Sequence, residues 1–115
     1  MPLLIQIANL EEGYPTVNQG LLRMEKALNQ ARAQGVTLLK LIHGYGSTGT
    51  GGRLREEAQK VLARQQRGGT IKAFIPGENF RTSDEITWEL LKKWPELKQD
   101  RDLSRNNKGI TLVVL

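Results

Sequence analysis

A nearly apolar run, a glycine-rich stretch and a helical pattern follow one another between residues 36 and 67, and no other feature constrains the fold as strongly. Residues 36–42 (VTLLKLI) favour a central parallel strand covered on both faces, because they are almost wholly apolar. The next ten residues hold five glycines, at positions 44, 46, 49, 51 and 52. Glycine has no Cβ, so this loop can bring backbone N–H groups close to an anion. A second helix is then expected to begin at Arg53 or Leu54.

Apolar periodicity predicts two elements ahead of this unit. Residues 3–7 (LLIQI) are expected to form a short, mostly buried strand. Thr16 and Gln19 have the spacing of a capping box, which predicts a helix that opens at Thr16 and is ended by Gly35. The apolar positions of this helix recur every three or four residues: Val17, Leu21, Met24, Leu28 and Ala31.

The remaining chain predicts two strands and a shorter helix. A strand is expected at residues 70–75, and Thr82 and Glu85 have capping-box spacing ahead of an amphipathic helix. Residues 98–108 (KQDRDLSRNNK) are polar and predict a mobile loop, and residues 109–115 (GITLVVL) predict the last strand.

The resulting order, β-α-β-α-β-(α)-β, predicts an α/β fold in a single domain over residues 1–115, with an inserted helix and loop at about 78–108. A chain of 115 residues is long enough for one layered core. Alternating strands and helices favour parallel strands with right-handed crossovers. The direction of the last strand stays open, because a long excursion precedes it.

Composition excludes several classes of protein. The chain has no cysteine, which excludes disulfides, thiolate zinc sites and a cysteine nucleophile and is compatible with a cytoplasmic location. No 18-residue apolar run is present, and the first residues lack the basic region of a signal peptide, so we expect neither a membrane span nor a signal peptide. The net charge of +5 fits a mildly basic domain and a polyanion-binding domain equally well.

The glycine-rich stretch fits neither of two common nucleotide-binding motifs. Residues 44–49 (GYGSTG) satisfy G-x-G-x-x-G, but they follow the second strand, the helix begins only after Gly52, and no acidic residue stands about 20 positions on. A nucleoside-triphosphate loop needs Lys-Ser or Lys-Thr after its last glycine, where this chain has Arg53 and Leu54. Two interpretations of the glycine-rich stretch remain. It is either a loop that leads into the positive N-terminus of a helix, or a flexible connector without function.

His43 is the single histidine, and it follows the central strand at its carboxyl end, where ligand sites of α/β proteins form. It is therefore a candidate phosphate donor or general acid/base, with a purely structural role as the alternative. One histidine without a carboxylate cluster does not make a metal site. We expect no cofactor and leave a divalent-metal requirement open.

The second helix carries a basic stripe. Its members are Arg53, Lys60, Arg64 and Arg67, which fall within about 60° of one another at 100° per residue. Either they contact the phosphates of a polynucleotide, or Glu56 and Glu57 pair with Lys60 and the stripe is only a solvated face. Trp88 and Trp94 do not share a helical face, so we expect one to be packed and one to be partly exposed.

Residues 42–55 (IHGYGSTGTGGRLR) resemble the His-Gly-x-Gly…Gly-x-Leu-Arg signature of the Smr (small MutS-related) domain family. The resemblance implies a fold similar to the carboxy-terminal domain of translation initiation factor three: an α+β two-layer sandwich with a four-stranded mixed sheet and its helices on one face. It also implies binding of DNA or RNA, often structured, and in several members cleavage. His43, Gly44 and Gly46 match the central motif, and Leu54 and Arg55 match its Leu-Arg.

The chain departs from the family pattern in its first strand and its length. The family's Leu-Asp-x-His or Leu-Asp-x-Arg motif is replaced by residues 5–8 (IQIA), five residues at 11–15 are extra, and residues 78–108 are longer than usual. We therefore predict a nucleic-acid-binding domain, with an endonuclease activity left open because His43 lacks a carboxylate partner. The candidate phosphate-binding residues are His43, Gly44, Gly46, Gly49, Gly51, Gly52, Arg53, Arg55, Lys60 and Arg64.

Two alternatives use the same residues differently. The domain could bind a small phosphorylated ligand through the loop, or it could be a protein-interaction domain that contacts a partner through the Trp88–Trp94 helix. The sequence leaves the choice between DNA and RNA, and the oligomeric state, open.

Overall fold

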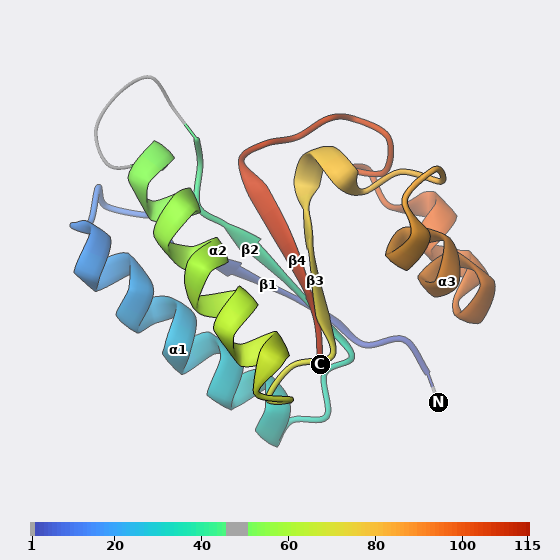
Figure 1. The fold of residues 1–115 in the computed structure, drawn as a ribbon, viewed down its shortest axis with the longest axis horizontal. Helices are drawn as coiled ribbons and strands as arrows, with labels where there is room; N and C mark the ends of the chain where they lie inside the picture. The colour runs from blue at the N-terminus through green and yellow to red at the C-terminus, as the bar shows by residue number, and fades with distance from the viewer. Residues whose placement is uncertain (1, 46–50) are drawn as a thin grey trace.

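The computed structural model describes residues 2–45 and 51–115, and within them the chain forms one four-stranded sheet and three α-helices (Figure 1). The elements in chain order are β1 (Ile5–Asn9), α1 (Val17–Ala33), β2 (Leu38–Ile42), α2 (Gly51–Arg67), β3 (Ala73–Pro76), α3 (Glu85–Lys93) and β4 (Ile110–Val114). Two 3-10 helices, η1 (Gly77–Asn79) and η2 (Pro95–Gln99), flank α3. No described helix has the length and apolar character needed to cross a bilayer.

The sheet is mixed, with strand order β1-β2-β4-β3. β2 pairs with β1 in parallel, and β4 runs antiparallel between β2 and β3. The last strand, whose direction the sequence left open, therefore lies inside the sheet. β2 is central and buried at four of its five residues, as its apolar composition predicted.

The first face of the sheet is covered by α1 and α2. Thr16 caps α1 through a complete capping box with Gln19, and Gly35 follows the helix with φ of +71°, so both ends of this helix were predicted correctly. α2 begins at Gly51, two residues before the earliest expected start. The buried core on this face contains Met24, Leu28 and Ala31 of α1, Leu54, Ala58 and Leu62 of α2, and Leu39, Leu41 and Val113 of the sheet.

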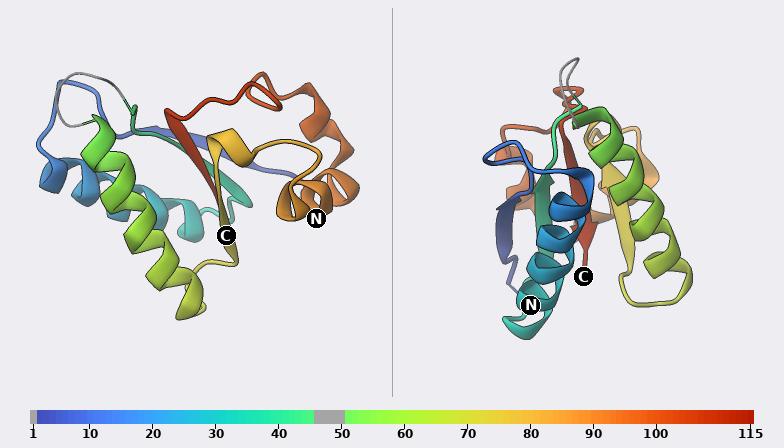
Figure 2. Two further views of the ribbon diagram at one scale, coloured as in Figure 1. Left: turned by 45° about the horizontal axis from the view of Figure 1, so that its top comes forward. Right: turned by 90° about the vertical axis from the view of Figure 1, so that its left-hand side faces the viewer.

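The second face is also covered, so the expectation of helices on one face only is wrong (Figures 1 and 2). Alternate residues of a strand point to opposite faces, and those on this side pack against α3 and the segment around it. The core here contains Leu38, Ile75, Ile110, Leu112 and Val114 of the sheet together with Phe80, Leu90, Leu91, Trp94 and Leu97. The cover stops short of β1, where Ile5 and Ile7 are 40% and 60% exposed.

Residues 98–108 are not the mobile loop that their polarity predicted. Lys40, which points from β2 into the second face, binds Asp100 at 2.9 Å and Asp102 at 2.7 Å, and all three are buried or nearly so. The Ser104 N–H donates to the Phe80 carbonyl oxygen at 2.8 Å. A buried ammonium needs carboxylate partners, and this need fixes the polar segment to the sheet.

The predicted capping box of the third helix is also wrong. The N-cap of α3 is Asp84, whose carboxylate accepts a hydrogen bond from the Thr87 N–H at 2.9 Å. Thr82 lies two residues earlier, outside the helix. Asp is as good an N-cap as Thr, so spacing alone could not choose between them.

Candidate functional site

The carboxyl end of β2, the start of β4 and the first turns of α2 meet at one end of the sheet. The N–H groups of His43 and Gly44 both donate to the Gly109 carbonyl oxygen, each at 3.0 Å. Gly44 has φ of +70°, and a Cβ there would collide with the Glu11 carboxylate. The positive φ favours glycine at this turn, whereas the Glu11 carboxylate is the end of a flexible side chain and can move aside. The Gly44 amide is already hydrogen-bonded inside the protein, so it is not the free phosphate donor that the sequence predicted.

His43 lies beneath α2 and is fully buried. Its Nδ1 is 2.5 Å from the Gly44 carbonyl oxygen, and its Nε2 is 2.8 Å from Thr111 Oγ1. A carbonyl can only accept, so we assign the proton to Nδ1, and Thr111 then donates to Nε2. The Gln59 side-chain amide donates in turn to Thr111 Oγ1 at 3.2 Å. This chain of hydrogen bonds ties α2 to β4 and to the glycine turn.

Burial lowers the pKa of the His43 imidazole below its ordinary value. The hydrogen bond to the Gly44 carbonyl partly offsets this effect, and the positive charge of Arg55 adds to it. The ring is thus neutral at pH 7, with both nitrogens engaged. His43 sits where the sequence predicted, but in this arrangement it offers no nitrogen to a phosphate.

Arg55 points toward the sheet rather than along the basic stripe. Its guanidinium pairs with the Glu78 carboxylate, and each side chain is 23% exposed. Glu78 follows Gly77, at which a Cβ would collide with the Asn107 carbonyl oxygen. Within the described residues, Arg55 Nε and Glu78 Oε1 are buried without a hydrogen-bond partner. This ion pair joins α2 to the segment that follows β3. Because Glu78 carries the opposite charge, it largely neutralises the charge of Arg55.

The basic stripe lies on the solvent side of α2, as predicted. Arg53, Lys60, Arg64 and Arg67 are all exposed. Lys60 pairs with Glu57 at 3.2 Å, but the two side chains are 67% and 40% exposed. Such a surface pair contributes little and leaves Lys60 available to another anion.

The glycines of the loop fall into two groups. Gly46 and Gly49 lie outside the described residues. Gly51 and Gly52 are the first two residues of α2, where the leading amides of any helix lack an intrahelical acceptor. The start of α2 thus keeps the positive end of its dipole beside the exposed Arg53.

The structure adds residues that sequence reasoning missed. Thr111 is a buried polar residue within an otherwise apolar strand, and that contrast was visible in the sequence. Gln59 stands four positions after Arg55 on the same helical face, which also could have been noticed. Nothing in the sequence pointed to Glu78 or Glu11, because their contacts are to residues far away along the chain.

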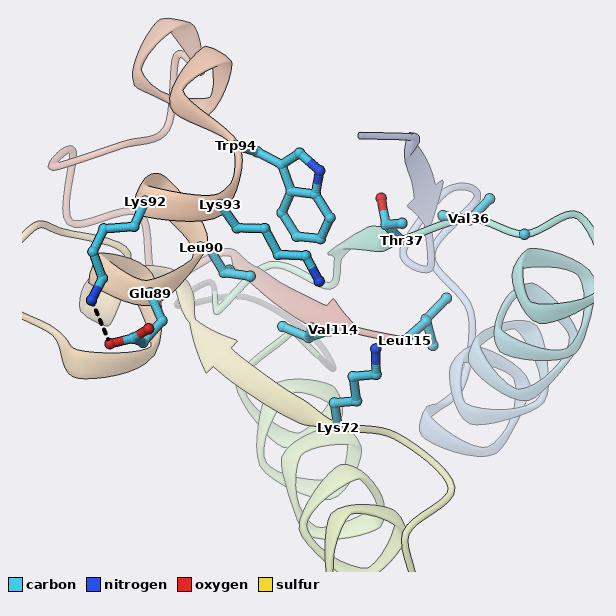
Figure 3. A pocket seen from close by; sticks show the side chains of 11 residues that line it. Val36, Thr37, Lys72, Glu89, Leu90, Lys92, Lys93, Trp94, Val114 and Leu115 are labelled. Atoms are coloured by element: carbon cyan, nitrogen blue, oxygen red, sulfur yellow. Dashed lines mark ion pairs between the residues drawn. The ribbon is translucent and has the colours of Figure 1, made fainter. Parts of the chain in front are cut away.

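Two hollows lie at opposite ends of the sheet. The hollow at the glycine turn, about 420 Å³, is lined by Glu11, Gly44, Tyr45, Arg101 and Asn107, among others. A larger one, about 630 Å³, lies between the start of β2 and α3, with Val36, Leu90 and Val114 on its walls (Figure 3). Lys72 and Lys93 reach into it, and the Lys93 ammonium lies 4.7 Å from the centre of the Trp94 ring. Among the described residues, no three His, Asp or Glu side chains gather as metal ligands.

Comparison with known proteins gives three findings. A sequence model of the Smr domain matches residues 13–92. Over 63 residues, 55% of this chain, the sequence is 38% identical to the Endonuclease MutS2 of Thermus thermophilus, and this stretch spans only 8% of that protein. The crystal structure of the Smr domain of Thermus thermophilus MutS2 is similar with a TM-score of 0.56 and 25% identity, over 98% of both chains.

Proposed function

The chain belongs to the Smr domain family, and on this premise we propose that it binds structured DNA or RNA through α2 and the end of the sheet beside it. Smr domains are associated with nucleic-acid binding, which supports a nucleic acid as the partner. The observation that carries the proposal is the basic stripe of α2, whose four cations are exposed and continue to the helix N-terminus. Phosphate contacts of this kind position a nucleic acid without reading its sequence.

Four candidate residues take different roles in this proposal. Arg53, Lys60 and Arg64 contact phosphates, because they are exposed and at most weakly paired. His43 is a positioning residue: its hydrogen bonds to Gly44 and Thr111 hold the glycine turn against β4.

Fluorescence anisotropy with a labelled DNA duplex, a branched DNA and an RNA stem-loop tests the proposal. We expect binding that weakens steeply with salt, and the variant Arg53→Gln/Arg64→Gln should bind roughly 50-fold more weakly in about 0.1 M salt, if each cation releases one counterion. The variant should also show a salt slope shallower by roughly 1.8 on duplex DNA. Absence of binding to all three probes, or binding that salt does not weaken, would overturn the proposal.

Endonuclease activity is a second candidate, favoured by the similarity to a protein named as an endonuclease. His43 would then have to leave its buried site to move a proton, while the neighbouring arginines stabilise charge on the phosphorus. A cleavage assay with branched DNA and folded RNA, with and without divalent metal, compares the wild type with His43→Gln. Binding without cleavage identifies a binder, and cleavage lost only in the variant supports the enzyme.

The two remaining alternatives make separate predictions. A small phosphorylated ligand bound at the glycine-rich loop would raise the melting temperature of the protein, whereas a duplex oligonucleotide would not. Trp88, which is 50% exposed while Trp94 is buried, would carry a protein contact. In that case Trp88→Ala would abolish partner binding and leave nucleic-acid binding unchanged.

A further inference from the structure

In the segment from Asp100 to Lys108, the acidic side chains point into the molecule and the basic side chains are exposed. Its two acids, Asp100 and Asp102, both turn inward and bind Lys40. Its three cations, Arg101, Arg105 and Lys108, are all exposed. Among the described residues, no carboxylate lies within ion-pair distance of these three cations. The segment is nearly neutral as a sequence, but the charged side chains that it exposes to solvent are all positive.

The inward carboxylates are held firmly. Burial alone raises the pKa of the Asp102 carboxyl, but the hydrogen bonds from Lys40 and Asn107 outweigh it, and the pKa lies below its ordinary value. Arg101 also lowers this pKa, although it forms no ion pair with Asp102. Asp102 is therefore ionised at neutral pH, and its carboxylate binds Lys40 rather than the exposed cations.

This cationic surface lies beside the glycine turn. Arg101 and Asn107 line the same hollow as Gly44. Gly109, directly after Lys108, accepts the hydrogen bonds of the His43 and Gly44 amides. Figure 1 shows the segment entering β4 at the end of the sheet where α2 begins.

We propose that Arg101, Arg105 and Lys108 form a second phosphate-contacting surface, so that one nucleic acid lies across the carboxyl end of β2 between this segment and α2. The inference rests on the proposed function and extends it to the opposite face of the sheet. Charge complementarity identifies the occupant: three exposed cations on one segment, of which Arg101 lines the hollow, suit the phosphodiester backbone of DNA or RNA. Glu11 is exposed and also lines the hollow, with its carboxylate against Gly44, so the phosphates lie beside the hollow rather than inside it.

The test measures affinity and salt slope for the same DNA duplex and RNA stem-loop with Arg101→Gln/Arg105→Gln. A second variant, Arg105→Gln/Lys108→Gln, leaves the neighbour of Asp102 intact in case the first disturbs the fold. The matched control, Lys72→Gln/Lys92→Gln, removes two exposed charges at the opposite end of the sheet. We expect each segment variant to bind roughly 50-fold more weakly in about 0.1 M salt, with a slope on duplex DNA shallower by roughly 1.8, and the control to change little.

The outcomes separate this inference from the proposed function. If the wild type binds and Arg53→Gln/Arg64→Gln weakens it, but both segment variants behave like the control, the second surface is overturned and the first stands. If the wild type binds neither probe, both fall. A weakening on only one probe supports the surface and identifies DNA or RNA as the partner.

Discussion

The two faces of the sheet are built on different principles. The face under α1 and α2 is a continuous apolar core, interrupted at the glycine turn by the hydrogen-bonded His43, Thr111 and Gln59. The face under the 78–108 segment has an apolar core of its own and, next to it, a buried ammonium between two carboxylates. The first face follows from periodicity within single elements, whereas the second depends on ion pairs between residues 60 and 62 positions apart.

The difference between the two faces shows how each acquires its positively charged surface. On the first face the basic stripe is the outer side of an amphipathic helix, so the helical pattern sets it directly. On the second face the cationic surface arises because Lys40 withdraws two acids from the exterior. The second face should therefore be the more fragile of the two.

The largest expected effect comes from removing Lys40. Lys40→Met leaves two buried carboxylates without their cation, and we expect the free energy of unfolding in urea to fall by roughly 3–5 kcal/mol. Adding Asp100→Asn and Asp102→Asn to this variant should restore most of the loss, because the remaining buried groups are then neutral. A loss below about 1 kcal/mol in the single variant would show that the ion cluster does not hold this face.

The pH dependence of stability tests the face of the sheet that α1 and α2 cover, where His43 lies. The pKa of His43 is lowered in the folded protein, so the unfolded chain binds a proton more readily, and stability should fall as pH drops below about 6.5. The free energy of unfolding falls by at most about 1.4 kcal/mol per pH unit. It continues to fall until the pH reaches the pKa of His43 in the folded protein. Chemical denaturation at several pH values from 7 to 5 measures it.

His43→Gln provides the control for this slope, since the chain has no other histidine. The variant lacks the titrating group and should show a flatter profile over the same range, whatever its overall stability. An unchanged slope would mean that His43 is accessible to protons in the folded protein, and its assignment as a buried positioning residue would be wrong.

The smallest effect concerns the N-caps of α1 and α3. Thr16→Ala and Asp84→Ala should each lower the free energy of unfolding by about 1 kcal/mol, because each removes the acceptor for a helix N-terminal amide. Thr82→Ala, at the cap position predicted from spacing, should stay within about 0.5 kcal/mol of the wild type. Equal losses at Thr82 and Asp84 would contradict the observed cap.

The sequence predicted where the candidate site lies better than it predicted the contacts of the residues in it. The resemblance of residues 42–55 to the Smr signature is confirmed, and so are the mixed sheet and the exposure of the stripe. The contact roles of His43, Gly44 and Arg55 differ from expectation, because partners distant in sequence, such as Thr111, Gly109 and Glu78, occupy their polar atoms. Whether the described residues bind phosphate stays a prediction.

The sequence by itself determined the order of the elements, the central place of β2, both ends of α1 and the outward stripe of α2, since local periodicity and capping chemistry set each of them. Only the tertiary structure decided that β4 lies between β2 and β3, that His43 is enclosed, and that Asp100 and Asp102 turn inward to Lys40. These features are contacts between distant segments: strand pairing and apolar burial place β4, and each buried polar group must meet a partner that no local pattern of residues records.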